Sequence, residues 1–195
     1  PNKHGITGWW TRLSEIGAAT AILRFTRRSD GRSLLDLDVT PEMAFPLPAL
    51  MAHTPRDALA IFPDGLGDSV FSTYVSGGRE RRTYRGLPEA VDIILDRVSR
   101  ASGPTYTYLY TDRIDSNAHL LGAEHDLVRE AVSELDGEVE RLARQLDGNG
   151  RVVLTADHGL LDVPTRESYL VRGSDSLMGL LRSPPSGDAR VMYLH

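Results

Sequence analysis

The stretch that decides the fold runs from Tyr106 to Gly159. It opens with Tyr-Thr-Tyr-Leu-Tyr-Thr-Asp-Arg-Ile-Asp-Ser-Asn-Ala-His (106–119) and closes with Arg-Val-Val-Leu-Thr-Ala-Asp-His-Gly (151–159). Residues 106–110 and 151–156 have the β-branched and aromatic composition of strands, and the second run is apolar enough to be buried. Between them, residues 124–146 carry apolar side chains at helical spacing. Strand, helix and strand in this order predict a βαβ unit with parallel strands.

Polar side chains follow each of these two strands. Asp115 and His119 come after the first, and Asp157 and His158 come after the second. Ligands of parallel sheets bind at the carboxyl ends of the strands, so we expect the two pairs to lie near one another. Each pair offers a carboxylate oxygen and an imidazole nitrogen, which are zinc ligands. Taken alone, either pair is explained as well by a capping or turn Asp beside a solvated His. Together they predict a metal site.

The remainder of the chain predicts an α/β protein with three layers and a mostly parallel central sheet. Residues 18–25 and 59–62 read as strands, residues 40–57 as loops with short helical turns, and residues 76–86 as an exposed polar loop. Pro88 suits a helix start, and Gly103-Pro104 ends that helix. A last segment, residues 189–194, resembles a strand.

The composition bounds the classes of function. The 195 residues suffice for one good core, and the net charge of −5 argues against nucleic acid as the main partner. There is no cysteine, so any metal must use His, Asp or Glu, and the absence fits a reducing compartment such as the cytoplasm. No apolar run approaches the roughly 18 residues of a membrane span.

The two motifs and the helix between them resemble the alkaline phosphatase superfamily, and within it the type I phosphodiesterase/nucleotide pyrophosphatase branch. The resemblance is strongest over residues 105–164. His-Gly-Ile-Thr-Gly at 4–8 also resembles the segment just downstream of that family's nucleophile. The resemblance to this family implies hydrolysis of a small phosphate ester or nucleotide at a site with two divalent metal ions, with zinc as the expected metal. Asp115 and His119 would bind one ion, and Asp157 and His158 would complete the two-metal site.

The resemblance also implies parts that this sequence does not display. The family uses a Thr or Ser nucleophile that forms a covalent intermediate, preceded by a metal-binding Asp, and both belong upstream of a His-Gly-Ile segment. A further His, followed by Gly, belongs after the position of His195. We therefore expect residues 1–195 to be a partial hydrolase domain, with a loop-rich insert at 27–87, that is an internal segment of a longer enzyme and inactive alone.

Several other residues could have a functional role, but a structural role explains each of them equally well. Asp64-Gly-Leu-Gly67 resembles the family's early metal motif but stands on the wrong side of His4, so a turn is preferred. Thr111 and Thr155 are expected to be structural. His195 lacks the following Gly, and three other residues (His4, His53 and His125) read as surface or turn histidines. Trp9-Trp10 could stack a base or pack in a core. The arginines of the polar loop (Arg79, Arg81, Arg82 and Arg85) read as a solvated surface.

Other functions stay open at this point. Within the superfamily, a phosphomonoesterase, phosphonate hydrolase or sulfatase is compatible with the same residues. A non-catalytic metal-binding or interaction domain is the alternative of another class. A redox-cofactor domain is disfavoured because no Gly-x-Gly-x-x-Gly follows any strand.

Overall fold

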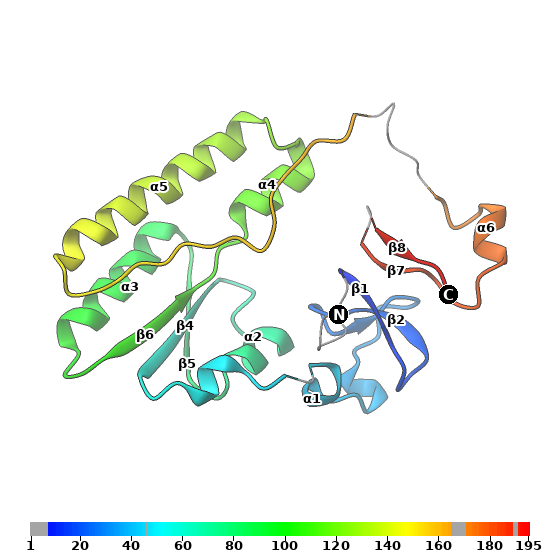
Figure 1. The fold of residues 1–195 in the computed structure, drawn as a ribbon, viewed down its shortest axis with the longest axis horizontal. Helices are drawn as coiled ribbons and strands as arrows, with labels where there is room; N and C mark the ends of the chain where they lie inside the picture. The colour runs from blue at the N-terminus through cyan, green and yellow to red at the C-terminus, as the bar shows by residue number, and fades with distance from the viewer. Residues whose placement is uncertain (1–7, 46, 165–170, 189–190) are drawn as a thin grey trace. The chain divides into compact units, whose positions relative to one another are not determined.

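The computed structural model describes residues 8–45, 47–164, 171–188 and 191–195, which form two compact units. Unit one comprises residues 1–52, 68–78 and 169–195, and unit two comprises residues 53–67 and 79–168. Figure 1 shows the elements of both. The predicted α/β class with a parallel sheet is confirmed. The insert predicted over residues 27–87 stays a prediction, although two strands of the parallel sheet come from that range.

Unit two is built on a parallel sheet in the order β5–β4–β6. The strands are β4 (Asp57–Pro63), β5 (Glu80–Tyr84) and β6 (Thr105–Leu109). Five consecutive residues of β4, Ala-Leu-Ala-Ile-Phe (58–62), are buried. Such a continuous apolar run is typical of a central parallel strand that is covered on both faces.

Two long helices cover one face of this sheet (Figure 1). They are α3 (Leu87–Arg100), which begins with Pro88 in its first turn, and α5 (Asp126–Leu146). The predicted helices match both within a few residues. A single apolar core joins sheet and helices. Its buried members are Leu59, Ile61, Tyr84, Leu87, Ala90, Val91, Ile94, Leu142 and Leu146.

The exposed loop predicted over residues 76–86 is wrong, because β5 lies within it. Its five residues, Glu-Arg-Arg-Thr-Tyr, pair in parallel with β4 from Leu59 to Pro63. Only Tyr84 is buried, and the charged side chains reach solvent. A polar edge strand of this kind is held by backbone hydrogen bonds to its neighbour, so hydrophobic alternation does not reveal it.

The buried strand predicted over residues 151–156 is also wrong. In the structure this run is extended and exposed, with 79% of Val153 and 66% of Leu154 accessible to solvent. No described strand pairs with it. β-branched composition favours a strand only where a neighbouring strand satisfies the backbone N–H and C=O groups. The βαβ unit predicted from β6 through α5 to this run is therefore absent from the described residues.

Unit one holds an antiparallel sheet in the order β3–β2–β1–β7–β8. Its strands are β1 (Trp10–Leu13), β2 (Ala18–Ala21), β3 (Thr26–Arg27), β7 (Ser186–Gly187) and β8 (Met192–Tyr193). The strand predicted over 18–25 is thus shorter, because residues 22–25 form a turn with Phe25 at positive φ. The predicted strand at 189–194 is reduced to β8, and residues 189–190 lie outside the described residues.

Short helices accompany the unit one sheet. They are η1 (Leu35–Leu37), α1 (Pro41–Ala44), η2 (Leu50–His53), α2 (Val70–Val75) and α6 (Ser176–Gly179). Two of these short helices, α1 and η2, lie within residues 40–57, where the prolines predicted loops with short helical turns. An aromatic cluster supports unit one, in which Phe45 packs against Phe25, Phe71 and Tyr74.

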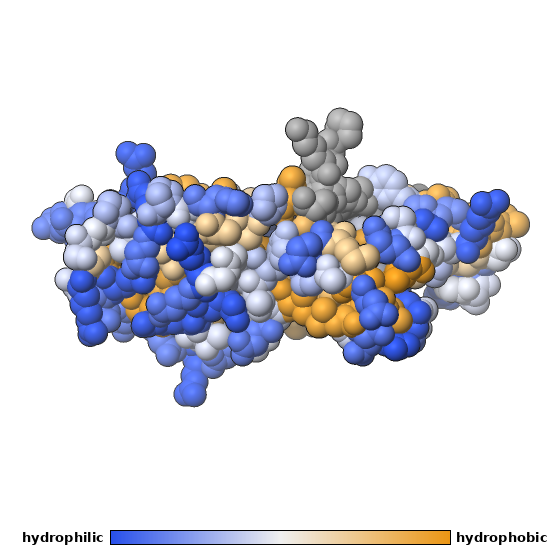
Figure 2. Space-filling view, turned by 90° about the horizontal axis from the view of Figure 1, so that it is seen from below, coloured by the Kyte–Doolittle hydropathy of each residue, from blue (hydrophilic) through white to orange (hydrophobic). Residues whose placement is uncertain are grey.

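The surface combines hydrophilic and apolar residues on the face drawn in Figure 2. None of the helices among the described residues is both long and apolar enough to cross a membrane.

Candidate metal centre

The first ligand pair lies on α4 (Arg113–Leu121), the helix that directly follows β6. Asp115 and His119 are four residues apart and therefore share one face of the helix. Asp115 Oδ1 lies 3.4 Å from His119 Nε2. At the start of the helix, Ser116 Oγ donates a hydrogen bond of 2.9 Å to Asp112 Oδ2. The helix itself thus fixes the distance between the two predicted ligands.

The second pair lies on the extended segment that follows α5. Asp157 and His158 are exposed there, and Asp157 Oδ2 is 3.6 Å from His158 Nε2. The His158 backbone N–H donates to Asp157 Oδ1 at 3.1 Å. The other ring nitrogen, His158 Nδ1, is 3.1 Å from the carbonyl oxygen of Gly159. Local contacts of this kind orient the imidazole with Nε2 free to act as a ligand.

The two pairs meet at Asp115. Its Oδ1 atom is 3.9 Å from His158 Nε2 as well as 3.4 Å from His119 Nε2, so the four side chains form one continuous series of contacts. The same oxygen is buried and has no hydrogen-bond partner within the described part of the chain. A buried carboxylate oxygen between two imidazoles is costly unless a proton or a cation lies beside it.

One hydrogen bond ties the extended segment to the helical pair. Asp162 Oδ1 accepts a hydrogen bond of 2.7 Å from the backbone N–H of Ala123, just beyond α4. Gly122 ends α4 at φ +92°, where a Cβ would lie 3.3 Å from Asp162 Oδ2. Glycine therefore allows the turn and leaves room for the Asp162 carboxylate.

The donor types fit a metal, but the ligand set is partial. Two carboxylates and two imidazoles are the hard and borderline donors that zinc accepts. Bonds of about 2.1 Å in a tetrahedron place neighbouring donors roughly 3.4 Å apart, close to the 3.4 and 3.6 Å within each pair. Across residues 8–45, 47–164, 171–188 and 191–195, however, no group of three or more His, Asp or Glu side chains is placed to hold an ion.

The field around these residues is negative. Burial raises the pKa of Tyr110, and the charges of Asp112, Asp157 and Asp115 raise it further. The pKa of Tyr108 is also raised, first by burial and then by Tyr106 and Asp157. Carboxylates that disfavour a second negative charge nearby favour a cation at the same place.

Structural roles account for the other unit two candidates. Asp64 follows β4, where its carboxylate pairs with Arg85 Nε at 3.5 Å, as expected of a turn. The Thr111 side chain hydrogen-bonds the Tyr84 phenol, and Thr155 Oγ1 donates to the Ala156 carbonyl oxygen at 3.4 Å. Neither hydroxyl is in the series of contacts that joins the four predicted ligands.

The described histidines outside the four predicted ligands, and the tryptophans Trp9 and Trp10, have local partners or are exposed. His125 is the N-cap of α5 and accepts from Leu127 N–H, and His53 is exposed in η2. In unit one, His195 Nε2 is 2.8 Å from Ser186 Oγ. Arg24 and Arg28 lie over the rings of Trp9 and Trp10, at 5.5 and 4.5 Å from the ring centroids. His4 lies outside the described residues.

The arginines predicted to be a solvated loop instead belong to β5 and its flanks. Arg79 donates to the Thr54 carbonyl and Arg81 to the Gly67 carbonyl, while Arg82 pairs with Glu80. Asp162, which anchors the second ligand pair, was not predicted from the sequence, because its partner is a backbone N–H 39 residues away.

Comparison with models of known protein families shows which family the chain belongs to. A model of the type I phosphodiesterase/nucleotide pyrophosphatase family matches residues 39–179, a range that contains all four predicted ligands. The chain belongs to this family. No curated protein and no solved structure matches it.

Membership of the family supports the coarse part of the predicted function. The family consists of phosphoester hydrolases that act on small phosphoesters or nucleotides and generally depend on metal ions. The recognition of the alkaline phosphatase superfamily from the two motifs is thereby confirmed.

Proposed function

We propose that Asp115, His119, Asp157 and His158 bind divalent metal ions, with zinc as the natural one, for hydrolysis of a small phosphodiester or nucleotide pyrophosphate. The observation that carries the proposal is the position of Asp115 Oδ1, which is buried, lacks a hydrogen-bond partner among the described residues and faces both imidazoles. Family membership supports the reaction class, and the donor chemistry supports the metal.

Bound zinc supplies a Lewis acid for the phosphoryl oxygens and activation of a nucleophile at neutral pH. The side chains of this protein would hold and orient the metal ions. Asp115 and His119 form the pre-arranged pair on α4, and Asp157 and His158 supply the second pair once the extended segment is fixed against it. A Thr or Ser nucleophile with a covalent intermediate is part of the proposal by resemblance to the family. We assign that role to no hydroxyl of the described residues.

Zinc affinity tests the ligand assignment without relying on activity. The 195-residue chain is titrated with zinc in competition with a chromophoric chelator, and cobalt is substituted to record its visible absorption bands. Asp115→Asn and His158→Gln should each weaken zinc binding roughly tenfold or more and change the cobalt spectrum. His53→Gln is the matched control, because this exposed histidine lies in η2 and is not one of the four predicted ligands. Equal affinity in all four proteins would refute the assignment.

A second candidate function is a metal-binding domain without catalysis. It is favoured by the exposure of Asp157 and His158 and by the absence of a ligand group of three or more among the described residues. Hydrolysis of bis-p-nitrophenyl phosphate with and without zinc separates the two. Zinc-dependent turnover that Asp157→Ala abolishes supports the hydrolase. Tight zinc binding without turnover in the same preparation fits the non-catalytic domain and equally the inactive hydrolase segment expected from the sequence, so turnover is the discriminating outcome.

A further inference from the structure

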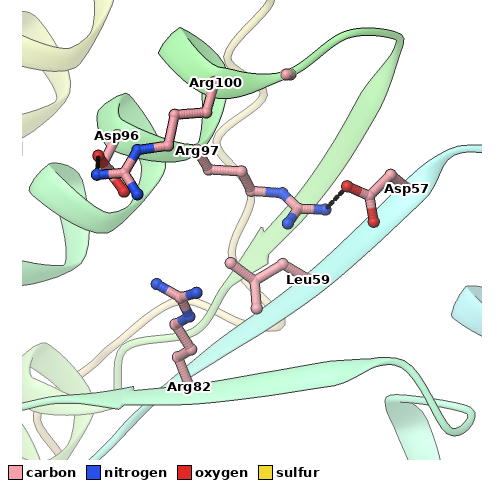
Figure 3. A pocket seen from close by; sticks show the side chains of 7 residues that line it. Asp57, Leu59, Arg82, Asp96, Arg97 and Arg100 are labelled. Carbon is pink, nitrogen blue, oxygen red and sulfur yellow. Dashed lines mark ion pairs between the residues drawn. The ribbon is translucent and has the colours of Figure 1, made fainter.

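A second polar site lies in unit two, in a pocket of about 210 Å³ (Figure 3). Three arginines line it, Arg82 from β5 and Arg97 and Arg100 from the last turn of α3. Two aspartates, Asp57 and Asp96, complete the charged lining, and the Leu59 side chain adds an apolar wall. Every one of these residues belongs to the same compact unit.

The pocket lies at the opposite end of the sheet from the candidate metal centre. Asp57 is the first residue of β4 and pairs with Thr105, the first residue of the parallel strand β6. The four predicted ligands come after the carboxyl end of β6. At about 3.3 Å per residue, the five residues of β6 separate the two edges by at least 13 Å. A ligand in this pocket is therefore not a substrate of the metal centre.

The burial of the Arg97 guanidinium is the main observation about this pocket. Only 13% of the Arg97 side chain is exposed, and among the described residues it pairs with Asp57, with Nη2 2.9 Å from Oδ2. Both Nε and Nη2 are buried; Nη2 is held by the ion pair with Asp57, whereas Nε has no hydrogen-bond partner among the described residues. A guanidinium has five N–H donors and loses several kcal/mol of hydration on burial, so it is stable only where acceptors meet those donors.

The other two arginines keep donors for a shared ligand. Arg82 Nε is 2.8 Å from Glu80 Oε1, and Arg100 Nη2 is 2.5 Å from Asp96 Oδ1. One carboxylate occupies only part of a guanidinium fork, so the remaining N–H groups are available. In Figure 3 the arginine side chains approach the pocket from two elements. The lining carries three arginines and two aspartates, and Glu80, which pairs with Arg82, lies beside it.

A purely structural role explains part of this arrangement. Basic residues in the last turn of a helix are stabilised by the helix dipole, which accounts for Arg97 and Arg100 on α3. It does not account for the burial of Arg97 Nε without an acceptor among the described residues, nor for the approach of Arg82 from the neighbouring strand. An anion with several acceptor oxygens accounts for both, because arginine binds such oxygens through paired N–H groups.

We propose that this pocket binds a tetrahedral phosphate, either free inorganic phosphate or the terminal phosphate of a small monoester. Arg97 provides the buried contact, and Arg82 and Arg100 close over the oxygens from β5 and α3. Asp57 orients Arg97 by holding its Nη2. The site needs no metal and is independent of the proposed zinc ligands.

Calorimetric titration of the 195-residue chain with inorganic phosphate, in the presence of a metal chelator, tests the proposal. Saturable binding is expected, and Arg82→Gln and Arg97→Gln should each weaken it roughly tenfold or more. Arg144→Gln is the matched control, because Arg144 is an exposed arginine of α5 that pairs with Glu140 outside the pocket. Because Arg82 is half-exposed, its substitution tests the site even if the Arg97 variant is unstable.

Two further titrations distinguish free phosphate from a phosphate monoester, and this pocket from the candidate metal centre. Titration with adenosine 5′-monophosphate instead of phosphate shows whether a monoester is preferred, and the arginine variants must weaken whichever ligand binds more tightly. Asp157→Asn should leave phosphate binding unchanged, so a failure of the zinc proposal does not touch this one. The proposal is overturned if no saturable binding occurs, or if Arg82→Gln, Arg144→Gln and the parent chain bind phosphate equally.

Discussion

The two halves of the candidate metal centre differ in how the chain holds them. Asp115 and His119 lie on α4, whose four-residue spacing sets their separation at 3.4 Å. Asp157 and His158 lie on an extended, exposed segment, and their position depends on the few contacts that segment makes. One half is arranged by backbone hydrogen bonds within a helix. The other half must be held by tertiary contacts.

This difference teaches where the proposed site gains and loses affinity. A ligand pair on a helix binds without first being ordered, whereas a pair on an exposed segment loses conformational entropy when the metal binds. The hydrogen bond from Ala123 N–H to Asp162 is a direct link that lowers this cost, because it fixes the segment four residues beyond His158. The three predictions below test the contrast between the packed part of unit two and the extended segment.

The largest effect is expected from a core residue of the packed part. Ile61→Ala in β4 removes a side chain with no exposed surface and should lower the free energy of unfolding by about 2–5 kcal/mol. Leu154→Ala in the extended segment should change it by less than about 0.5 kcal/mol, because 66% of that side chain is already exposed. Urea unfolding followed by circular dichroism measures both. A loss of similar size in the two variants would mean that the segment is packed in solution.

A smaller effect is expected at the link between the two halves. Asp162→Ala removes the acceptor of the Ala123 N–H, a hydrogen bond worth about 0.5–1.5 kcal/mol. Zinc affinity should fall roughly two- to tenfold, although Asp162 is not a proposed ligand. Competition titration measures the change, with Asp136→Ala, an exposed acid of α5, as the control. An effect no larger than that of Asp136→Ala would show that the hydrogen bond does not organise the second pair.

The smallest effect is expected in the pH dependence of the free energy of unfolding, through Tyr84 in the packed part of unit two. Burial raises the pKa of the Tyr84 phenol, and its hydroxyl donates to the Tyr110 carbonyl oxygen at 2.9 Å. The stability from the neutral phenol is therefore fully present below about pH 10, the unfolded value, and is lost as pH rises through the higher folded value.

Tyr84→Phe should cost about 1 kcal/mol at pH 7, and this difference from the parent chain should shrink above pH 10. Urea unfolding at pH 7, 9 and 11 measures it. A difference that stays constant over this range would contradict the raised pKa.

Much of the fold could be predicted where local pattern and burial agree. The apolar stripe of residues 124–146 predicted α5, and Pro88 with the apolar residues that follow predicted α3. The run at 59–62 predicted the buried centre of β4. β5 could not be predicted, because its polar residues form a strand only through pairing with β4. The prediction for residues 151–156 was wrong in the opposite sense. Their composition is typical of a strand, but no strand among the described residues pairs with them.

The sequence by itself determined the family, the α/β class and the four residues that carry the proposed metal chemistry, because ligand types and their spacing are local properties of the chain. Only the tertiary structure decided that Asp115 faces both His119 and His158, that Asp162 anchors the second pair, and that Arg82 joins Arg97 in one pocket. These contacts join residues that are far apart in sequence. Their distances are set by how the sheet and helices pack, and no local pattern encodes that packing.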